Sequence, residues 1–230
     1  MRILIADTTW NSMIAAKALA DAGLLLTRAN DGQELFEYAD LSAQNVILFD
    51  ADLPDIGPLD CLRRLRAEHP ETGIVLMADE TDMAFRLRAL QLGADDVVSR
   101  KVKSGELVAR VQAIARRRSG HAAPVFEIEG LQIDTLSRQA RVGGKALPLT
   151  RMEYELLELL AMRTGQIVDK DRIMAQLYAL GDAPDIRIIG VYIHHIRAKI
   201  AAFGGNPSIL ENVRGRGYSL MEAMPQDVAA

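Results

Sequence analysis

Five short apolar segments alternate with five amphipathic helical patterns in residues 1–118, and this alternation restricts the possible folds more than any other feature. The apolar segments cover residues 2–6, 24–28, 45–50, 73–78 and 95–99. The helical patterns cover residues 10–22, 31–40, 58–69, 81–92 and 103–118. Strands that alternate with helices in this way form a parallel sheet with helices on both of its faces. We therefore predict an α/β domain with a doubly wound, five-stranded parallel sheet in residues 1–118.

Three aspartates, Asp7, Asp50 and Asp79, stand at or just after the ends of predicted strands. The carboxyl ends of parallel strands lie along one edge of the sheet, where ligands bind in open α/β folds. Asp50 ends the apolar run Val46–Asp50 and precedes a turn that contains Pro54, so a buried strand delivers its carboxylate to this edge. The sequence therefore predicts a polar site that is centred on Asp50.

The composition argues against several classes of protein. The net charge is −4, which argues against a protein that coats nucleic acid through bulk charge but leaves room for a local basic surface. Cys61 is the only cysteine, so no internal disulfide forms, and the cysteine and four histidines do not have the spacing of metal ligands. No apolar run approaches the ~18 residues of a membrane helix. We expect a cytoplasmic protein without a Cys/His metal site.

The pattern changes after residue 118. Residues 119–124 contain Gly and Pro without apolar periodicity and predict a short linker. The next strands are expected at 126–129, 131–134, 138–142 and 145–148. Three helices follow, the first opened by a capping box from Thr150 to Glu153, the second near 169–178 and the third near 186–202, before a hairpin at about 208–221. This predicts an α+β domain over residues 125–222, followed by a disordered tail at 223–230.

The third of these helices has two different faces. The apolar face carries Ile189, Ile193, Ile196 and Ile200 and is expected to pack on the core. The opposite face and its flanks carry Arg187, Val191, His194, His195, Arg197 and Lys199. Hydrogen-bond donors beside a small apolar group suit the base edges of a major groove, and flanking cations suit phosphates. Taken alone, this face fits an ordinary solvated helix as well as it fits a DNA-binding helix.

The final hairpin favours the nucleic-acid interpretation. Its turn, Arg214-Gly215-Arg216-Gly217, places two arginines on a glycine-rich ribbon. Glycine permits a tight bend and a close approach to another backbone, and arginine is the side chain that enters narrow minor grooves. The combination with a cationic helix indicates DNA binding more strongly than either element alone.

Residues Leu149 to Leu220 resemble the winged-helix domain of the OmpR/PhoB family of response regulators. The resemblance rests on Leu149-Thr150 with Glu153, the isoleucine-spaced helix from Arg187 to Ile200, and Val213 to Tyr218. The first half resembles the receiver domain of the same family, and the second half looks most like its cell-cycle and flagellar regulators in alphaproteobacteria. One departure is Gly190, where the family usually has aspartate. The resemblance implies a transcription regulator with promoter DNA, RNA polymerase and a second copy of the chain as partners.

The resemblance also implies a pocket around Asp50, the phosphoacceptor position, and most of its other members are replaced. The family's acidic pair becomes Asp7-Thr8, its Ser/Thr becomes Ala78, its lysine becomes Arg100, its cis proline becomes Lys101 and its aromatic switch residue becomes Val97. Phosphoryl transfer needs a hard cation held by several oxygens and positive charge on the moving oxygens. Only Asp7 and Asp50 remain as weak Mg²⁺ candidates. We predict that Arg100 or Lys101 pairs with Asp50 or Asp7 instead.

The family dimerises through its fourth helix, fifth strand and fifth helix, with charged pairs across the interface. The matching positions of this chain carry the same charges, and the expected pairs are Arg86 with Glu106 and Asp96 with Arg110. The resemblance therefore implies a homodimer, and the loop 178–185 before the third helix of the second half is the position that meets RNA polymerase in the family.

The leading hypothesis is a DNA-binding regulator that is active as a dimer without phosphorylation of its receiver. Two alternatives stay open. One is a conventional regulator phosphorylated on Asp50 by a histidine kinase, and the other is a protein-interaction module with secondary DNA binding. An enzyme is disfavoured because no nucleophile is paired with a base.

Overall fold

The computed structural model describes residues 1–230 except 42–43, 80–81, 121–122, 179–182 and 222–230. The chain forms two compact units, the first containing Met1–Gly120 and the second containing most of the remaining residues, and they are described separately. The expected tail at 223–230 and part of the expected partner loop at 178–185 lie outside the described residues. No helix among the described residues is long and apolar enough to cross a membrane.

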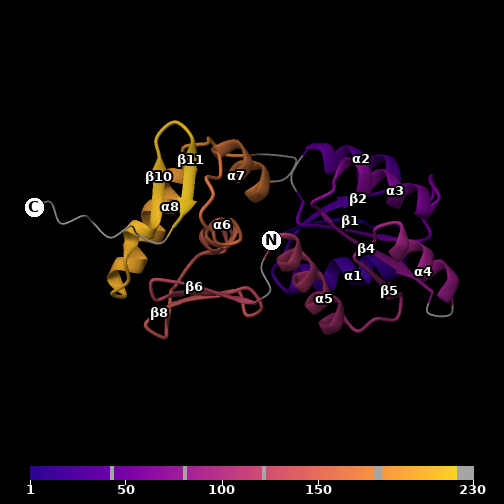
Figure 1. Ribbon diagram of the computed structural model, residues 1–230, viewed down its shortest axis with the longest axis horizontal. Helices are drawn as coiled ribbons and strands as arrows, with labels where there is room; N and C mark the ends of the chain where they lie inside the picture. Colours follow the sequence, from indigo (N-terminus) through magenta and orange to yellow (C-terminus); the bar gives the residue numbers. More distant parts are fainter. Residues whose placement is uncertain (42–43, 80–81, 121–122, 179–182, 222–230) are drawn as a thin grey trace, which may run out of the picture. The chain divides into compact units, whose positions relative to one another are not determined.

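The first unit contains the predicted five-stranded parallel sheet (Figure 1). The strands are β1 (Arg2–Ala6), β2 (Leu25–Ala29), β3 (Val46–Asp50), β4 (Gly73–Ala78) and β5 (Asp96–Ser99). They are arranged in the order β2-β1-β3-β4-β5, and every neighbouring pair is parallel. The helices are α1 (Trp10–Asp21), α2 (Gly32–Leu41), α3 (Pro58–Glu68), α4 (Met83–Gln91) and α5 (Ser104–Arg118). The predicted doubly wound α/β fold is therefore confirmed.

Helices cover both faces of this sheet, with α2 and α3 on one face and α1 packed beside α5 on the other (Figure 1). Strands β1, β3 and β4 consist entirely of buried residues, because each of their side-chain rows meets a helical layer. Phe49 and Leu76, for example, belong to one core cluster with Leu62 of α3 and Phe36 of α2. This packing holds the carboxyl ends of the strands along one edge of the sheet, and Asp7, Asp50 and Asp79 lie at this edge as predicted.

Element ends agree with the predicted ranges to within two residues, and a side-chain cap and a tight turn explain two of the differences. Helix α4 begins at Met83 instead of 81, because the Asp82 side chain accepts a hydrogen bond from the Phe85 backbone N–H. Strand β6 (Val125–Ile128) ends before Glu129, because Glu129 and Gly130 adopt φ values of 46° and 78° that form a tight turn.

The second unit begins with a four-stranded antiparallel sheet of β6, β7 (Leu131–Asp134), β8 (Gln139–Val142) and β9 (Lys145–Ala146). Helices α6 (Arg151–Ala161), α7 (Lys170–Leu177) and α8 (Ile188–Ala202) follow. The predicted capping box is present at Thr150 and Glu153. Asp169 caps α7, since its Oδ1 accepts a hydrogen bond from the Arg172 N–H at 2.7 Å.

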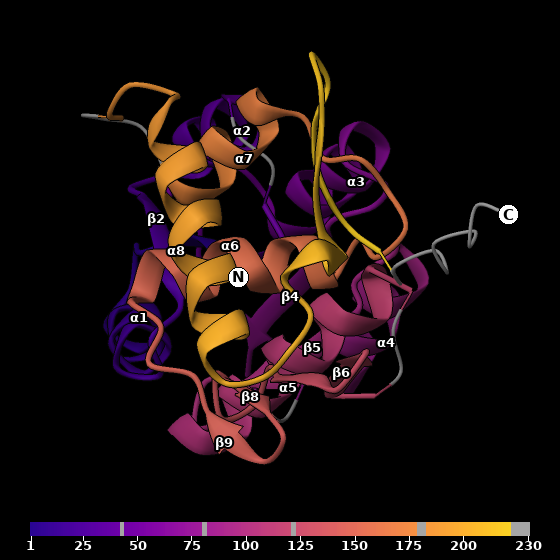
Figure 2. The same cartoon turned by 90° about the vertical axis from the view of Figure 1, so that its left-hand side faces the viewer.

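A short 3-10 helix η1 (Pro207–Ile209) leads into the antiparallel hairpin of β10 (Leu210–Val213) and β11 (Gly217–Leu220). In Figure 2 helix α8 lies in front of α6, and the yellow hairpin projects beside it. An isolated bridge between Val168 and Tyr218 connects the hairpin to the segment before α7. Three helices followed by such a hairpin make this unit a winged helix.

Candidate functional site

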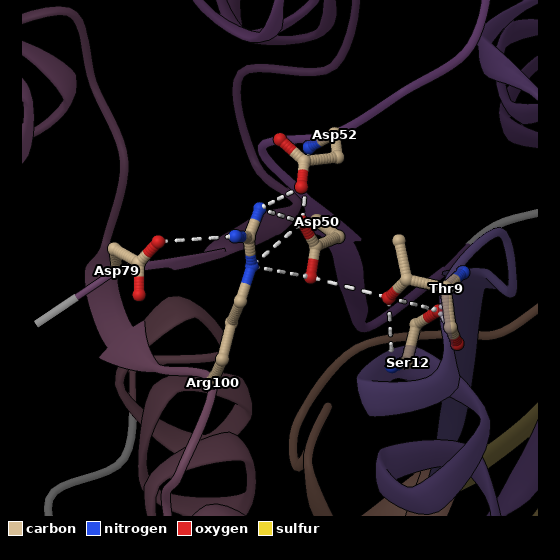
Figure 3. Close-up of polar contacts among 6 residues, drawn as sticks. All are labelled: Thr9, Ser12, Asp50, Asp52, Asp79 and Arg100. Carbon is tan, nitrogen blue, oxygen red and sulfur yellow. Dashed lines mark hydrogen bonds and ion pairs between the residues drawn. The ribbon is translucent and has the colours of Figure 1, made fainter.

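Arg100 is the centre of the site at the carboxyl edge of the receiver-like sheet (Figure 3). It directly follows β5, and its guanidinium reaches aspartates that follow or end two other strands. Its Nη2 lies 2.6 Å from Asp50 Oδ1, its Nε lies 3.1 Å from the same oxygen, and its Nη1 lies 3.3 Å from Asp79 Oδ2. Nη2 also forms an ion pair with Asp52. We call Arg100 with Asp50, Asp52 and Asp79 the arginine clamp.

Within the clamp, the positive charge of Arg100 compensates the buried negative charge of Asp50. The Asp50 side chain is fully buried, while 18% of the Arg100 side chain is exposed. Removing one member of a buried pair leaves an uncompensated charge, which costs about 3–5 kcal/mol. The hydrogen bond to Asp50 raises the pKa of Arg100 above its usual value, although partial burial opposes this, and Asp52 adds to the increase. Arg100 is therefore a permanent cation beside Asp50, as arginine is in proteins generally.

Asp50 accepts two further hydrogen bonds from donors other than Arg100. Its Oδ1 accepts the Asp52 backbone N–H at 2.9 Å, and its Oδ2 accepts the Thr9 hydroxyl at 3.3 Å. Thr9 is also the N-cap of α1 and forms a capping box with Ser12, so the start of α1 is tied to the clamp (Figure 3). Both carboxylate oxygens of Asp50 are thus occupied by donors from this chain.

The remaining predicted pocket residues do not join the clamp. Asp7 Oδ2 pairs with Arg28 Nη1 at 2.8 Å, so Asp7 is bound by neither Arg100 nor Lys101. Ala78, the last residue of β4, and Val97 of β5 are buried and offer no polar atom from their side chains. The Lys101 side chain is exposed, and its backbone N–H donates to Ser99 Oγ. The predicted pairing is therefore confirmed in one of its forms, between Arg100 and Asp50.

These residues do not fit a bound Mg²⁺ ion. Magnesium requires oxygen ligands in nearly octahedral geometry, often from more than one carboxylate. Here the oxygens of Asp50 accept hydrogen bonds from Arg100, Thr9 and the Asp52 backbone, and Asp7 is paired with Arg28. The other Asp7 oxygen, Oδ1, and Thr8 Oγ1 are buried without a hydrogen-bond partner among the described residues, but they belong to one carboxylate and one hydroxyl.

Sequence reasoning missed Thr9, Asp52 and Arg28 as members or neighbours of this site. The Thr9-to-Ser12 spacing is a capping signal, and it could have placed Thr9 at the start of α1 beside the strand ends. Asp52 lies two residues after Asp50, the spacing at which an aspartate side chain accepts a backbone N–H. No short-range signal links Arg28 to Asp7, since β2 and β1 become neighbours only through the sheet.

The charged residues predicted to form a dimer interface pair within one chain. Arg110 of α5 lies 2.9 Å from Asp96 Oδ2 and 2.7 Å from Glu106 Oε1. Arg86 of α4 donates from Nη2 to the backbone oxygen of Val97 at 2.8 Å. These contacts hold α4, β5 and α5 together in a single chain.

In the second unit, α8 buries Ile189, Ile193, Ile196 and Ile200, as the sequence predicts. The opposite surface exposes Val191, His194 and His195, and the wing turn exposes Arg214 and Arg216. Arg187 precedes the helix instead of lying within it: it is the N-cap residue, and its guanidinium pairs with Asp185 at 2.9 Å. The predicted recognition surface is therefore presented to solvent, with Arg187 at its leading end.

Both cations that were predicted to bind phosphates make contacts inside the domain. Arg197 donates from Nε and Nη2 to the backbone oxygen of Leu210, at 3.0 and 2.6 Å, and so joins α8 to the wing. Lys199 Nζ lies 2.6 Å from Oε2 of the buried Glu153, and His195 Nδ1 lies 3.4 Å from its other oxygen. Burial alone would raise the pKa of Glu153, but the hydrogen bonds from Lys199 and Thr150 lower it below its usual value. These contacts fix the orientation of α8 on α6.

A five-stranded receiver-like domain followed by a winged helix defines the class of DNA-binding response regulators. Residues 3–112 match the family model of the response regulator receiver domain, and residues 144–220 match that of the C-terminal domain of transcriptional regulatory proteins. The chain is 36% identical over 191 residues to the cell cycle response regulator CtrA of Brucella ovis, covering 83% of this chain and 82% of the relative. The CtrA protein of Brucella abortus gives the same values.

Among solved structures, the response regulator DrrB of Thermotoga maritima, an OmpR/PhoB homologue, is 22% identical with a TM-score of 0.46, covering 96% of this chain and 98% of that chain. A redox sensor of the streptococci, described as evolved from two-component response regulators, is 25% identical with a TM-score of 0.47, covering 96% and 99%. The chain belongs to the OmpR/PhoB family of response regulators, whose winged helix makes it a DNA-binding transcription regulator.

Proposed function

We propose that this regulator binds promoter DNA as a homodimer and that phosphorylation of Asp50 is not its on-switch. The observation that carries this proposal is the position of Arg100, whose guanidinium binds the fully buried carboxylate of Asp50. A phosphoryl group would have to displace this guanidinium. It would also meet Ala78 at the position where a hydroxyl is needed to bind a phosphoryl oxygen.

The arginine clamp offers a physical substitute for the phosphoryl group. It joins the ends of β3 and β5 to Asp79, which follows β4, and so holds these three strand ends together. Phosphorylation of a response regulator in the family acts at these same strand ends. A clamp made of side chains holds one conformation permanently, and control then passes to protein level, dimerisation or partner binding.

For DNA we propose that Arg187, Val191, His194 and His195 face base edges and that Arg214 and Arg216 of the wing enter or flank the minor groove. Exposure of these side chains and the rigid seating of α8 support this assignment. Arg197 and Lys199 position α8 through Leu210 and Glu153, and their remaining N–H groups are available to phosphates. The exposed apolar residues Leu87 and Leu90 on α4 support dimerisation of the receiver, and the loop 178–185 is the proposed contact for RNA polymerase.

Chemical phosphorylation with mass spectrometry tests the central claim. Unmodified protein incubated with phosphoramidate and Mg²⁺ is expected to show only trace modification of Asp50, because the carboxylate is occupied and no metal site is assembled. A conventional family member treated in parallel serves as the positive control. Stoichiometric modification of Asp50, accompanied by tighter DNA binding, would establish the competing function of a kinase-controlled regulator. The position of Asp50 at the tip of β3 is what favours that alternative.

A further inference from the structure

A cationic cavity lies in the receiver between α4, β5 and α5, on the side of β5 that no strand covers. Its volume is about 360 Å³, and its lining includes Arg86, Ser99, Lys101, Lys103, Glu106 and Arg110. The four cations and one carboxylate of the lining carry a net charge of +3, whereas the whole chain carries −4. Positive charge is thus concentrated in a hollow of an acidic protein.

The two lysines of this cavity are the groups left free to bind a ligand. Arg110 is held by Asp96 and Glu106, and Arg86 uses one nitrogen on the Val97 carbonyl. Lys101 and Lys103 are exposed, and neither makes an ion pair within the part of the chain that the structure describes. Ser99 accepts a hydrogen bond from the Lys101 N–H, so its own hydroxyl proton remains available to a ligand oxygen.

We propose that this cavity binds a small molecule that bears a phosphate or diphosphate group. Ammonium groups bind phosphate as point charges, and a hydroxyl donor beside them adds a directional contact. The volume lies at the lower end of the range for small-molecule sites, which suits a ligand no larger than a mononucleotide. Lys101 occupies a position where the family has proline, so this chain has gained a cation at the cavity instead of a rigid turn.

Such a ligand would act on the same surface that we propose for dimerisation. Arg86, Glu106 and Arg110 belong to both, so an anion in the cavity competes with the carboxylates that now pair with Arg110. The proposal does not depend on the phosphorylation state of Asp50, because the ligand binds at a different set of side chains.

Isothermal titration of the full-length protein with pyrophosphate, AMP and inorganic phosphate tests the proposal, with sodium acetate at equal ionic strength as the reference. We expect saturable binding of pyrophosphate or AMP at one site per chain. A higher affinity for AMP than for inorganic phosphate identifies the ligand as a phosphate ester. A higher affinity for inorganic phosphate identifies it as free phosphate. The Lys101→Ala/Lys103→Ala variant is expected to weaken binding by about tenfold or more.

Two matched variants locate the site. Lys145→Ala/Lys170→Ala removes the same charge from exposed positions of the second unit and is expected to bind like the wild type. Lys101→Arg/Lys103→Arg keeps the charge and is expected to retain binding. The proposal is overturned if no probe binds, if acetate binds equally well, or if Lys101→Ala/Lys103→Ala binds with unchanged affinity.

Discussion

At the scale of single residues, the surroundings of the two wing-turn glycines, Gly215 and Gly217, differ in whether they leave room for a side chain. A Cβ atom on Gly217, where φ is 148°, would lie 2.0 Å from the Val168 carbonyl oxygen. A Cβ atom on Gly215, where φ is 73°, meets no atom within 4 Å. Gly217→Ala is therefore expected to lower the stability of the winged helix by at least about 2 kcal/mol, since both the strained φ and the clash must be relieved.

Gly215→Ala is the matched control, and its cost is expected to be only about 1 kcal/mol from the left-handed backbone. Thermal unfolding followed by circular dichroism compares the two. Equal losses of stability would show that the approach of β11 to Val168 does not restrict the turn. The sequence indicated that glycine was needed here, but the tertiary neighbour that makes Gly217 the more demanding position became visible only in the fold.

Arg187 differs from the wing arginines in what it is expected to read. Its place at the N-cap of α8 puts its guanidinium at the leading end of the recognition surface, where it now pairs with Asp185. Arg187→Ala is expected to cost about 1–3 kcal/mol on the preferred site and to relax the preference at one base position. Arg214→Ala is expected to weaken binding without changing the preference at the base positions that α8 contacts. Selection of bound oligonucleotides followed by sequencing measures both, and an unchanged base preference in Arg187→Ala would contradict the assignment.

The clamp shows how far residue types alone can predict a site. A pair between Arg100 or Lys101 and Asp50 or Asp7 was predicted, because a carboxylate at a strand end needs a cation and the usual metal ligands are replaced, and the structure contains the pair of Arg100 with Asp50. Asp52 and Thr9 were not predicted, since their contacts depend on the turn after β3 and on the entry of α1. Lys101 was considered equivalent to Arg100 from the sequence, but the turn after β5 directs its side chain to solvent.

At the scale of elements, the seating of α8 on α6 depends on one carboxylate. Glu153 closes the capping box of α6 and binds Lys199 of α8, and these hydrogen bonds lower its pKa below the usual 4.5 even though burial opposes this. A depressed folded-state pKa gives stability that is fully present above the unfolded pKa and is lost as the pH falls through the folded pKa. The winged helix should therefore lose this contribution below about pH 4.5.

Lys199→Met tests this coupling. The variant is expected to destabilise the winged helix by about 1–3 kcal/mol at pH 7, because a buried carboxylate loses its cation. Its unfolding temperature should also depend less on pH in the acid range than that of the wild type. Lys170→Met, at an exposed position, is the control. Parallel pH profiles for Lys199→Met and wild type would argue against the role of Glu153.

The order and type of the elements followed from periodicity, since strands with buried rows and helices with one apolar face have distinct patterns. The ends of the elements were predicted less accurately from the sequence. The sequence placed Arg187 inside the third helix of the winged domain, whereas α8 begins at Ile188. The Asp185 side chain accepts the Arg187 N–H at 2.8 Å, and this local turn competes with a further helical residue.

At the scale of the whole molecule, the question is whether the arginine clamp alone separates this regulator from phosphorylated members of its family. Restoring the three of the five replaced groups that bind the metal or the phosphoryl oxygens tests this: Thr8→Asp returns the second carboxylate, Ala78→Thr returns the hydroxyl, and Arg100→Lys frees Asp50 while keeping a cation. The triple variant is expected to change modification of Asp50 by phosphoramidate from trace to nearly stoichiometric, in a Mg²⁺-dependent manner, because the metal and phosphoryl ligands are again complete.

Arg100→Lys alone is expected to gain little, since the hydroxyl and the second carboxylate are still missing. Adding Asp50→Asn to the triple variant should abolish the modification and so identify the acceptor. Intact-protein mass spectrometry reports the phosphoryl group, and circular dichroism confirms that each variant is folded. A folded triple variant that resists phosphoramidate would mean that the shape of the pocket, held by the hydrogen bonds of Thr9 and Asp52 to Asp50, prevents phosphorylation independently of Arg100.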